Sequence, residues 1–148
     1  MISPETLRRY PYFAEIDEAC LKAVAMHTRE THVPAGVQIF GAGEPAAHLH
    51  LILHGEVDIR YVLDRGELRT VDTLVDGDIL AWSALVEPHR TTASAVARRE
   101  TSLASISAPE LRALCEETPL LGYHLMSGIA KLLAHRLECT CVQLAVVG

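Results

Sequence analysis

The chain lacks the features that mark secreted, membrane-spanning or cysteine-clustered proteins. Its 148 residues contain no apolar run of about 18 residues, the length that a membrane helix needs. The first residues, MISPETLRRYPYF, place Pro, Glu and Arg where a signal peptide would be apolar. Its four cysteines, Cys20, Cys115, Cys139 and Cys141, form no C-x-x-C pair. We therefore expect a cytoplasmic protein without membrane contact, whose thiols are reduced and mostly buried.

The sequence also lacks an excess of positive charge and the common catalytic motifs. Lys and Arg number 13 against 19 Asp and Glu, a formal net charge of −6. Direct DNA binding is not expected, because neutralising phosphates needs a basic face. There is no G-x-S-x-G, H-E-x-x-H or P-loop, and Ser83 has no assignable base. We predict that the chain is not an enzyme.

Composition is that of one ordinary folded domain spanning residues 1–148, with 49% hydrophobic and 22% charged residues. Two short helices are predicted within residues 3–27. The first covers residues 3–10 with Ser3 as its cap, and the second covers residues 17–27 with Asp17 as its cap.

Residues 29–107 show no helix-length apolar face. They form short β-rich runs separated by turns every 8–12 residues, which predicts an all-β sandwich or barrel of about eight strands. In the run EVDIRYVL at residues 56–63, apolar and polar positions alternate. The residues expected on its apolar face are Val57, Ile59 and Tyr61, and those on its polar face are Glu56, Asp58 and Arg60.

Helical periodicity returns in residues 109–146. A short helix is predicted at residues 109–117 and a long one at residues 120–146. The long helix has two apolar stripes: Met126, Ile129, Leu133, Leu137, Thr140 and Leu144 form one, and Leu121, Leu125, Leu132 and Val142 the other. Two apolar faces need two partners. The β-body supplies one, and a second copy of the helix is the simplest candidate for the other, which predicts a homodimer.

Three segments carry a distinctive order of glycines. They are VPAGVQIFGAGEPAAHLHLILHGEVDI, VDGDILAWSALVEPHRTTASAVA and ISAPELRALCEETPLLGYHLMSGIAKLLAHRL. In this order and spacing they resemble the cyclic nucleotide-binding domains of catabolite activator proteins and kinase regulatory subunits. The resemblance implies a mainly β fold, a jelly-roll barrel with short N-terminal helices, a short helix and a long C-terminal helix. DNA-binding members continue into a helix-turn-helix domain, which we do not expect here.

The second segment resembles the phosphate-binding cassette of that family, here residues 77–94. A short helix near residues 81–84 would offer backbone N–H groups to an anion, and Arg90 would add a guanidinium. The resemblance implies cAMP or cGMP as the ligand and no other cofactor. The predicted ligand-binding residues are Ala81, Trp82, Ser83, Ala84, Arg90, Thr91, Thr92 and Ser94.

The cassette departs from the family pattern at two positions. Nucleotide-binding members carry Gly-Glu-Leu or Gly-Glu-Ile, whose Glu accepts a hydrogen bond from the ribose 2′-hydroxyl. Here Trp82 stands at that position, and an indole cannot accept. The family's phosphate Arg directly precedes a Thr/Ser-Ala pair, where this chain has Thr91. Arg90 comes one residue early, which on a strand turns its side chain to the other face unless a bulge intervenes.

Three functional hypotheses follow from these observations. The first is a stand-alone regulatory module that binds a small anionic ligand at the cassette and signals through its C-terminal helix to a partner protein. The second is a protein-interaction or dimerisation domain with a degenerate pocket that binds no nucleotide. The third is a small cupin-like metalloprotein, based on His48-x-His50 with a third ligand such as His32 or His89.

Cys139 and Cys141 stand two residues apart on the long helix, so they point to different faces and are not expected to form a disulfide with each other. Whether either has a redox role is left open.

Overall fold

The computed structural model describes residues 2–147. Its strands are β1 Thr28–Val33, β2 Gln38–Phe40, β3 His48–His54, β4 Glu56–Val62, β5 Leu68–Val75, β6 Ile79–Leu80, β7 Ser94–Ala97 and β8 Thr101–Ser107. Its helices are α1 Pro4–Arg8, α2 Glu18–Met26, the one-turn 3₁₀ helix η1 Trp82–Ala84, α3 Ala108–Glu117 and α4 Pro119–Val147. The predicted helices at both ends of the chain are confirmed, with boundaries that differ by about two residues or fewer.

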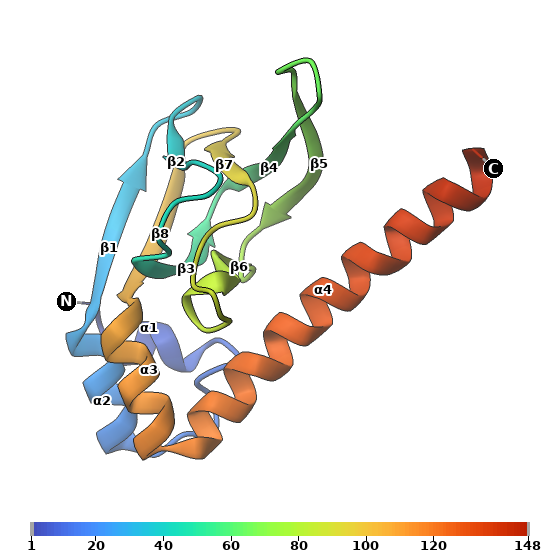
Figure 1. Cartoon of the computed structure of the whole chain (residues 1–148). Coiled ribbons are helices and arrows are strands. Elements are labelled where there is room, and N and C mark those ends of the chain that lie inside the picture. The colour runs from blue at the N-terminus through green and yellow to red at the C-terminus, as the bar shows by residue number, and fades with distance from the viewer. Residues whose placement is uncertain (1, 148) are drawn as a thin grey trace.

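The strands form two four-stranded antiparallel sheets, in the orders β1-β8-β3-β6 and β2-β7-β4-β5. The two sheets face each other as a β-roll, and α1, α2, α3 and the first turns of α4 gather at one end of it (Figure 1). The prediction of a mainly β jelly roll with about eight strands and terminal helices is confirmed.

Helices α1 and α2 differ in how their N-termini are capped. Asp17 accepts a hydrogen bond from the backbone N–H of Cys20 at 2.7 Å, so its predicted capping role is confirmed. Ser3 occupies the N-cap position of α1 as predicted, but its side chain makes no capping hydrogen bond. The connection after α1 is instead fixed by Arg8, whose Nη1 donates to the carbonyl of Ile16 at 2.7 Å.

The predicted alternation of β4 is only partly correct. Val57 and Ile59 are buried, but Tyr61 is exposed and Asp58 is buried. A register shift between Ile59 and Arg60 interrupts the pairing of β4 with β5 and turns the later side chains outward. Asp58 is satisfied where it lies, since Thr73 Oγ1 donates to its carboxylate at 2.8 Å.

The core has two parts. One lies between the sheets and includes Ile52, Val57, Leu74, Leu80 and Leu103. The other joins the helices to the outer side of the β1-β8-β3-β6 sheet and includes Phe13, Leu21, Leu49, Ala84, Ile106, Leu111, Leu121, Leu125 and Ile129. Because the second part contains side chains from α1 to α4, it fixes the base of the long helix.

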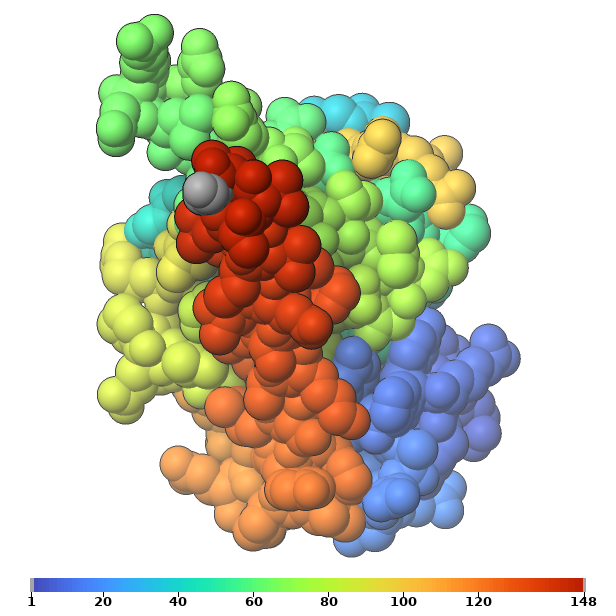
Figure 2. All heavy atoms as spheres, turned by 90° about the vertical axis from the view of Figure 1, so that its right-hand side faces the viewer, coloured from blue at the N-terminus to red at the C-terminus, as the bar shows by residue number. Residues whose placement is uncertain are grey.

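Beyond its first turns α4 leaves the body of the protein. Its buried side chains are Leu121, Leu125 and Ile129, all in the first half of the helix. The second half runs diagonally past the β4–β5 hairpin and ends away from the helical base (Figure 1). Seen from that side, the helix crosses the face of the roll and the hairpin projects next to its end (Figure 2). No helix of residues 2–147 combines the length and the apolar character that crossing a membrane would take.

The expectation of mostly buried thiols is wrong for two of the four. Cys20 is buried and Cys115 is half-buried, and burial raises the pKa of the Cys115 thiol to about 11. Cys139 and Cys141 are exposed, because they belong to the second half of α4, beyond its buried residues Leu121, Leu125 and Ile129. All four are free thiols.

We predict that Gly128→Ala destabilises the domain by about 1–3 kcal/mol. A Cβ at Gly128 would lie 2.9 Å from Tyr12 Cδ1, and the Tyr12 ring is anchored because its hydroxyl donates to the carbonyl of Gly77 at 2.8 Å. Urea unfolding midpoints measure the effect. Gly122→Ala in the same helix is the control: its Cβ would meet Cys115 Cβ at 3.4 Å, an ordinary contact, so the better helix propensity should add up to about 1 kcal/mol. A Gly128→Ala protein as stable as the control contradicts the prediction.

Candidate functional site

The cassette turns sharply after β6. Ala81 adopts a left-handed conformation with φ 61° and ψ 50°, and η1 follows as one 3₁₀ turn. The predicted short helix is therefore present but has only three residues. Ser83 and Ala84 are buried, whereas Trp82 is half-buried.

The end of η1 is connected to α3 by a hydrogen bond. Arg112 Nη1 donates a hydrogen bond to the carbonyl of Ala84 at 2.7 Å. Ala84 also belongs to the core that α3 and α4 share. Ser83 and Trp82 precede it directly and line a cavity, and Trp82 also packs against that core. One helical turn thus contacts both the cavity and the C-terminal helices.

Thr91, which stands where the family has its phosphate Arg, organises the neighbouring loop. Its hydroxyl donates to the carbonyl of Gly41 at 2.6 Å and accepts from the backbone N–H of Glu44 at 3.0 Å. Both bonds hold the turn between β2 and β3 against the end of the cassette. The side chain is buried, as these contacts require.

Arg90 lies outside the cavity. His89 before it has a left-handed φ of 60°, so the backbone is irregular at the point where the sequence suggested a bulge. The Arg90 side chain is exposed, and its Nη2 donates to the carbonyl of Gly43 at 2.6 Å. In this arrangement its guanidinium helps to hold the same turn between β2 and β3.

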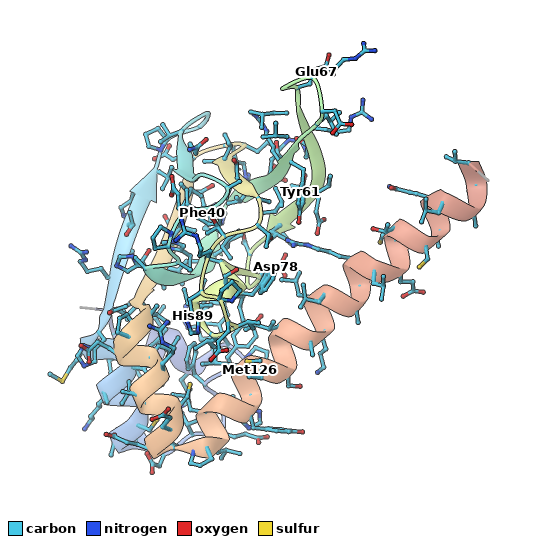
Figure 3. The ribbon with its side chains drawn as sticks, viewed as in Figure 1. Phe40, Tyr61, Glu67, Asp78, His89 and Met126 are labelled. Atoms are coloured by element: carbon cyan, nitrogen blue, oxygen red, sulfur yellow. The ribbon has the colours of Figure 1, made fainter. Side chains whose placement is uncertain are left out.

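The cavity beside the cassette is small, about 20 Å³, which is room for roughly one water. Five of the predicted residues line it, namely Ala81, Trp82, Ser83, Thr91 and Thr92. The structure does not place Ala84, Arg90 or Ser94 on its surface. Phe40 of β2 reaches it from within the roll (Figure 3), and the other lining residues are Ile59, Leu74, Ile79, Leu80, Ala93 and Arg136.

Arg136 is the one cation among the described residues that line this cavity. It comes from α4, and its Nε donates to Asp72 Oδ2 of β5 at 3.0 Å. The two side chains are only 19% and 25% exposed, so solvent screens the pair less than a surface ion pair. Arg136 was not among the predicted site residues. The signal available was its position four residues after Leu132, which packs against the core between the sheets.

The family profile described as "Cyclic nucleotide-binding domain" matches residues 30–118 of this chain, a span that includes the whole cassette. The chain belongs to the cyclic nucleotide-binding domain family. Domains of this family are typically regulatory rather than catalytic, and no catalytic family is indicated. No DNA-binding domain is evident among residues 2–147.

Two relatives and one solved structure show the extent of the similarity. A putative cyclic nucleotide-binding protein from Geobacter metallireducens is 35% identical, with a TM-score of 0.81, and the match covers 93% of this chain and 99% of that one. The cyclic AMP receptor protein of Thermus thermophilus is 32% identical over 71% of this chain and 47% of its own length. An uncharacterized NTE family protein of Mycobacterium tuberculosis is 28% identical over 86% of this chain and 21% of its own length. This domain therefore spans about a fifth and about half of the two curated relatives.

Two histidines of β3, His48 and His50, stack with each other, and His50 also stacks with Phe40 of β2. The His50 ring lies 6.1 Å from Phe40 and 5.9 Å from His48, and its Nδ1 is 2.7 Å from Ser105 Oγ. Burial, followed by the charge of His48, lowers the pKa of His50 to about 4. Among residues 2–147 no three His, Cys, Asp or Glu side chains gather around one point that could hold an ion. The cupin-like hypothesis built on His48 and His50 stays a prediction.

We predict that His50 makes the stability of this domain fall in mild acid. The folded-state pKa of about 4 lies below the ordinary value of 6.5, so as pH falls the unfolded chain takes up this proton first. Stability should be complete above about pH 6.5 and decline toward pH 4, by about 1–2 kcal/mol between pH 7 and pH 5. Urea midpoints at these two pH values measure it.

The variant His50→Asn should show a smaller difference between the two pH values, whatever it costs at pH 7. His32→Asn, which changes an exposed histidine on β1 of the same sheet, serves as the control and should keep the wild-type difference. An unchanged pH difference in His50→Asn would refute the assignment.

Proposed function

We propose that this domain is a regulatory module that senses a small anionic ligand at residues 77–94, with a cyclic nucleotide as the leading candidate. One observation carries the proposal: residues of the cassette and Arg136 of α4 line the same cavity. An anion there would compete with Asp72 for the guanidinium. It would thereby favour one docking of α4 over another, which is the requirement for signalling through that helix to a partner protein.

The names of the relatives support nucleotides as the first ligands to test. One is called a cyclic AMP receptor protein and another a CRP-like cAMP-activated global transcriptional regulator. The cavity offers donors suited to a phosphate, in Ser83, Thr92 and Arg136. At Trp82 it offers no acceptor for a ribose hydroxyl, so we expect weaker discrimination between ribose-containing ligands.

A specific observation also favours the degenerate-pocket alternative. A volume of about 20 Å³ is far below the roughly 300–1,000 Å³ of ordinary ligand pockets. In that reading Trp82 fills the site, and the domain acts through its surface alone. Ligand titration separates the two functions.

We further propose that two copies associate through α4 in the region of residues 120–146. Leu137, Val142 and Leu144 are 65%, 58% and 66% exposed. They continue the apolar pattern of the buried first half of the helix beyond the point where the chain's own core ends. Leu137 and Leu144 lie seven residues apart on one face of the helix, and Val142 belongs to its other apolar stripe. Exposed apolar side chains at such spacing are typical of a helix–helix interface.

The ligand prediction is tested by thermal unfolding with saturating cAMP, cGMP or a cyclic dinucleotide. A ligand at about 100 times its Kd adds roughly 2.7 kcal/mol, which should raise Tm by about 5 °C or more in a domain of this size. Arg136→Ala should remove most of the shift. Arg90→Ala tests the cation that the sequence nominated, and because Arg90 lies outside the cavity we expect most of the shift to survive. No shift with any nucleotide would favour the degenerate pocket.

The dimer prediction is tested by sedimentation equilibrium. The double variant Val142→Glu/Leu144→Glu should convert a dimer to a monomer, because two carboxylates would be brought into an apolar contact. Met26→Glu changes a residue of similar exposure, 67%, on α2, and should leave the mass unchanged. An unaltered mass for the double variant rules out α4 as the interface.

A further inference from the structure

A large groove lies between α4 and the β4–β5 hairpin, next to the cassette. Its volume is about 840 Å³, and Trp82 and Arg136 line both this groove and the small cassette cavity. Ordinary ligand pockets measure roughly 300–1,000 Å³. A ligand that contacts Trp82 and Arg136 therefore has room for its bulk in this groove.

We propose, on the basis of the function proposed above, that the groove binds a cyclic dinucleotide, a ligand with two phosphates and two aromatic bases. The groove offers two groups of each matching kind. It presents two aromatic side chains, Tyr61 and Trp82, and two guanidinium groups, Arg69 and Arg136. Its volume lies toward the upper end of the range for small-molecule sites.

The two aromatic side chains come from different elements of the fold. Tyr61, 39% exposed, belongs to the hairpin (Figure 3). Half-buried Trp82 begins η1 at the cassette. Each has a free surface on which a base can stack, and base–aromatic stacking contributes about 1–3 kcal/mol per base. Where the family pattern has a Glu that accepts from the ribose, this chain thus has an aromatic ring on which a base can stack.

The two guanidiniums differ in their present partners. Arg69 is exposed on β5 and stands opposite Tyr61 in the strand register. Arg136 is paired with Asp72, whose carboxylate also lines the groove. A phosphate at Arg136 must displace that carboxylate, whereas Arg69 is open to the second phosphate. A mononucleotide has one phosphate and leaves one guanidinium unused.

Trp82 is the only tryptophan of the chain, so its fluorescence reports on this groove. The full chain is titrated with cyclic di-GMP and cyclic di-AMP, and with cGMP and the linear dinucleotide pGpG for comparison. Calorimetry repeats each titration. One cyclic dinucleotide should bind at least about tenfold more tightly than cGMP or pGpG. Arg69→Ala and Arg136→Ala should each weaken it about tenfold or more. Arg65→Ala, in the hairpin turn and outside the lining, should have no effect.

The outcomes separate this inference from the proposed function. Binding of cGMP or cAMP as tight as that of the cyclic dinucleotides, with Arg69→Ala without effect, overturns the inference and leaves the nucleotide-sensing function standing. If pGpG binds as tightly as the cyclic dinucleotides, the inference that the ligand is cyclic is wrong. No binding of any nucleotide in either assay overturns both. If Arg69→Ala changes the sedimenting mass but not the affinity, a second copy occupies the groove and the inference fails.

Discussion

The cassette and the two C-terminal helices are built into one hydrophobic core. Ala84 of η1, Leu111 of α3 and Leu121 and Leu125 of α4 belong to a single buried cluster, and Arg112 adds a hydrogen bond to the carbonyl of Ala84. Protein interiors are close-packed and have little room to absorb a displacement locally. A change in the position of this turn must therefore be taken up by α3 and α4. The rest of the proposed regulation depends on that shared packing.

Beyond the hydrophobic core, α4 makes few contacts with the rest of the domain. Its second half is largely exposed, and the Arg136–Asp72 pair is its hydrogen-bonded link to β5. Such a partly buried pair stabilises weakly in net terms, because the desolvation of both ions offsets much of their attraction. An added anion can therefore shift the balance at modest cost. The base of α4 is therefore fixed by the core, whereas its distal half depends on few contacts.

Local sequence patterns predicted most of the fold because they arise from local physics. Turn residues and alternating runs located the strands, and Asp17 marked the start of α2. The irregularity in β4 after Ile59 was not predictable from alternation, since it depends on pairing with β5. At the site, Trp82, Ser83 and Thr91 could be nominated from the cassette pattern. Arg136 and Asp72 could not, because their contact joins segments 64 residues apart in the chain through tertiary packing alone.

The two departures from the family cassette have one physical consequence in common. At position 82 an aromatic ring replaces a hydrogen-bond acceptor, and at position 91 a hydroxyl replaces a guanidinium. Both hydrogen bonds of that hydroxyl go to the turn between β2 and β3, so it is not free to bind a ligand. The cassette thus loses both groups that would read a ribose phosphate from one side. The remaining unassigned recognition chemistry lies on the opposite wall, on α4 and the β4–β5 hairpin. If ligand selectivity is encoded in this domain, it is encoded in the same elements that would move when the ligand binds, so recognition and response become a single event.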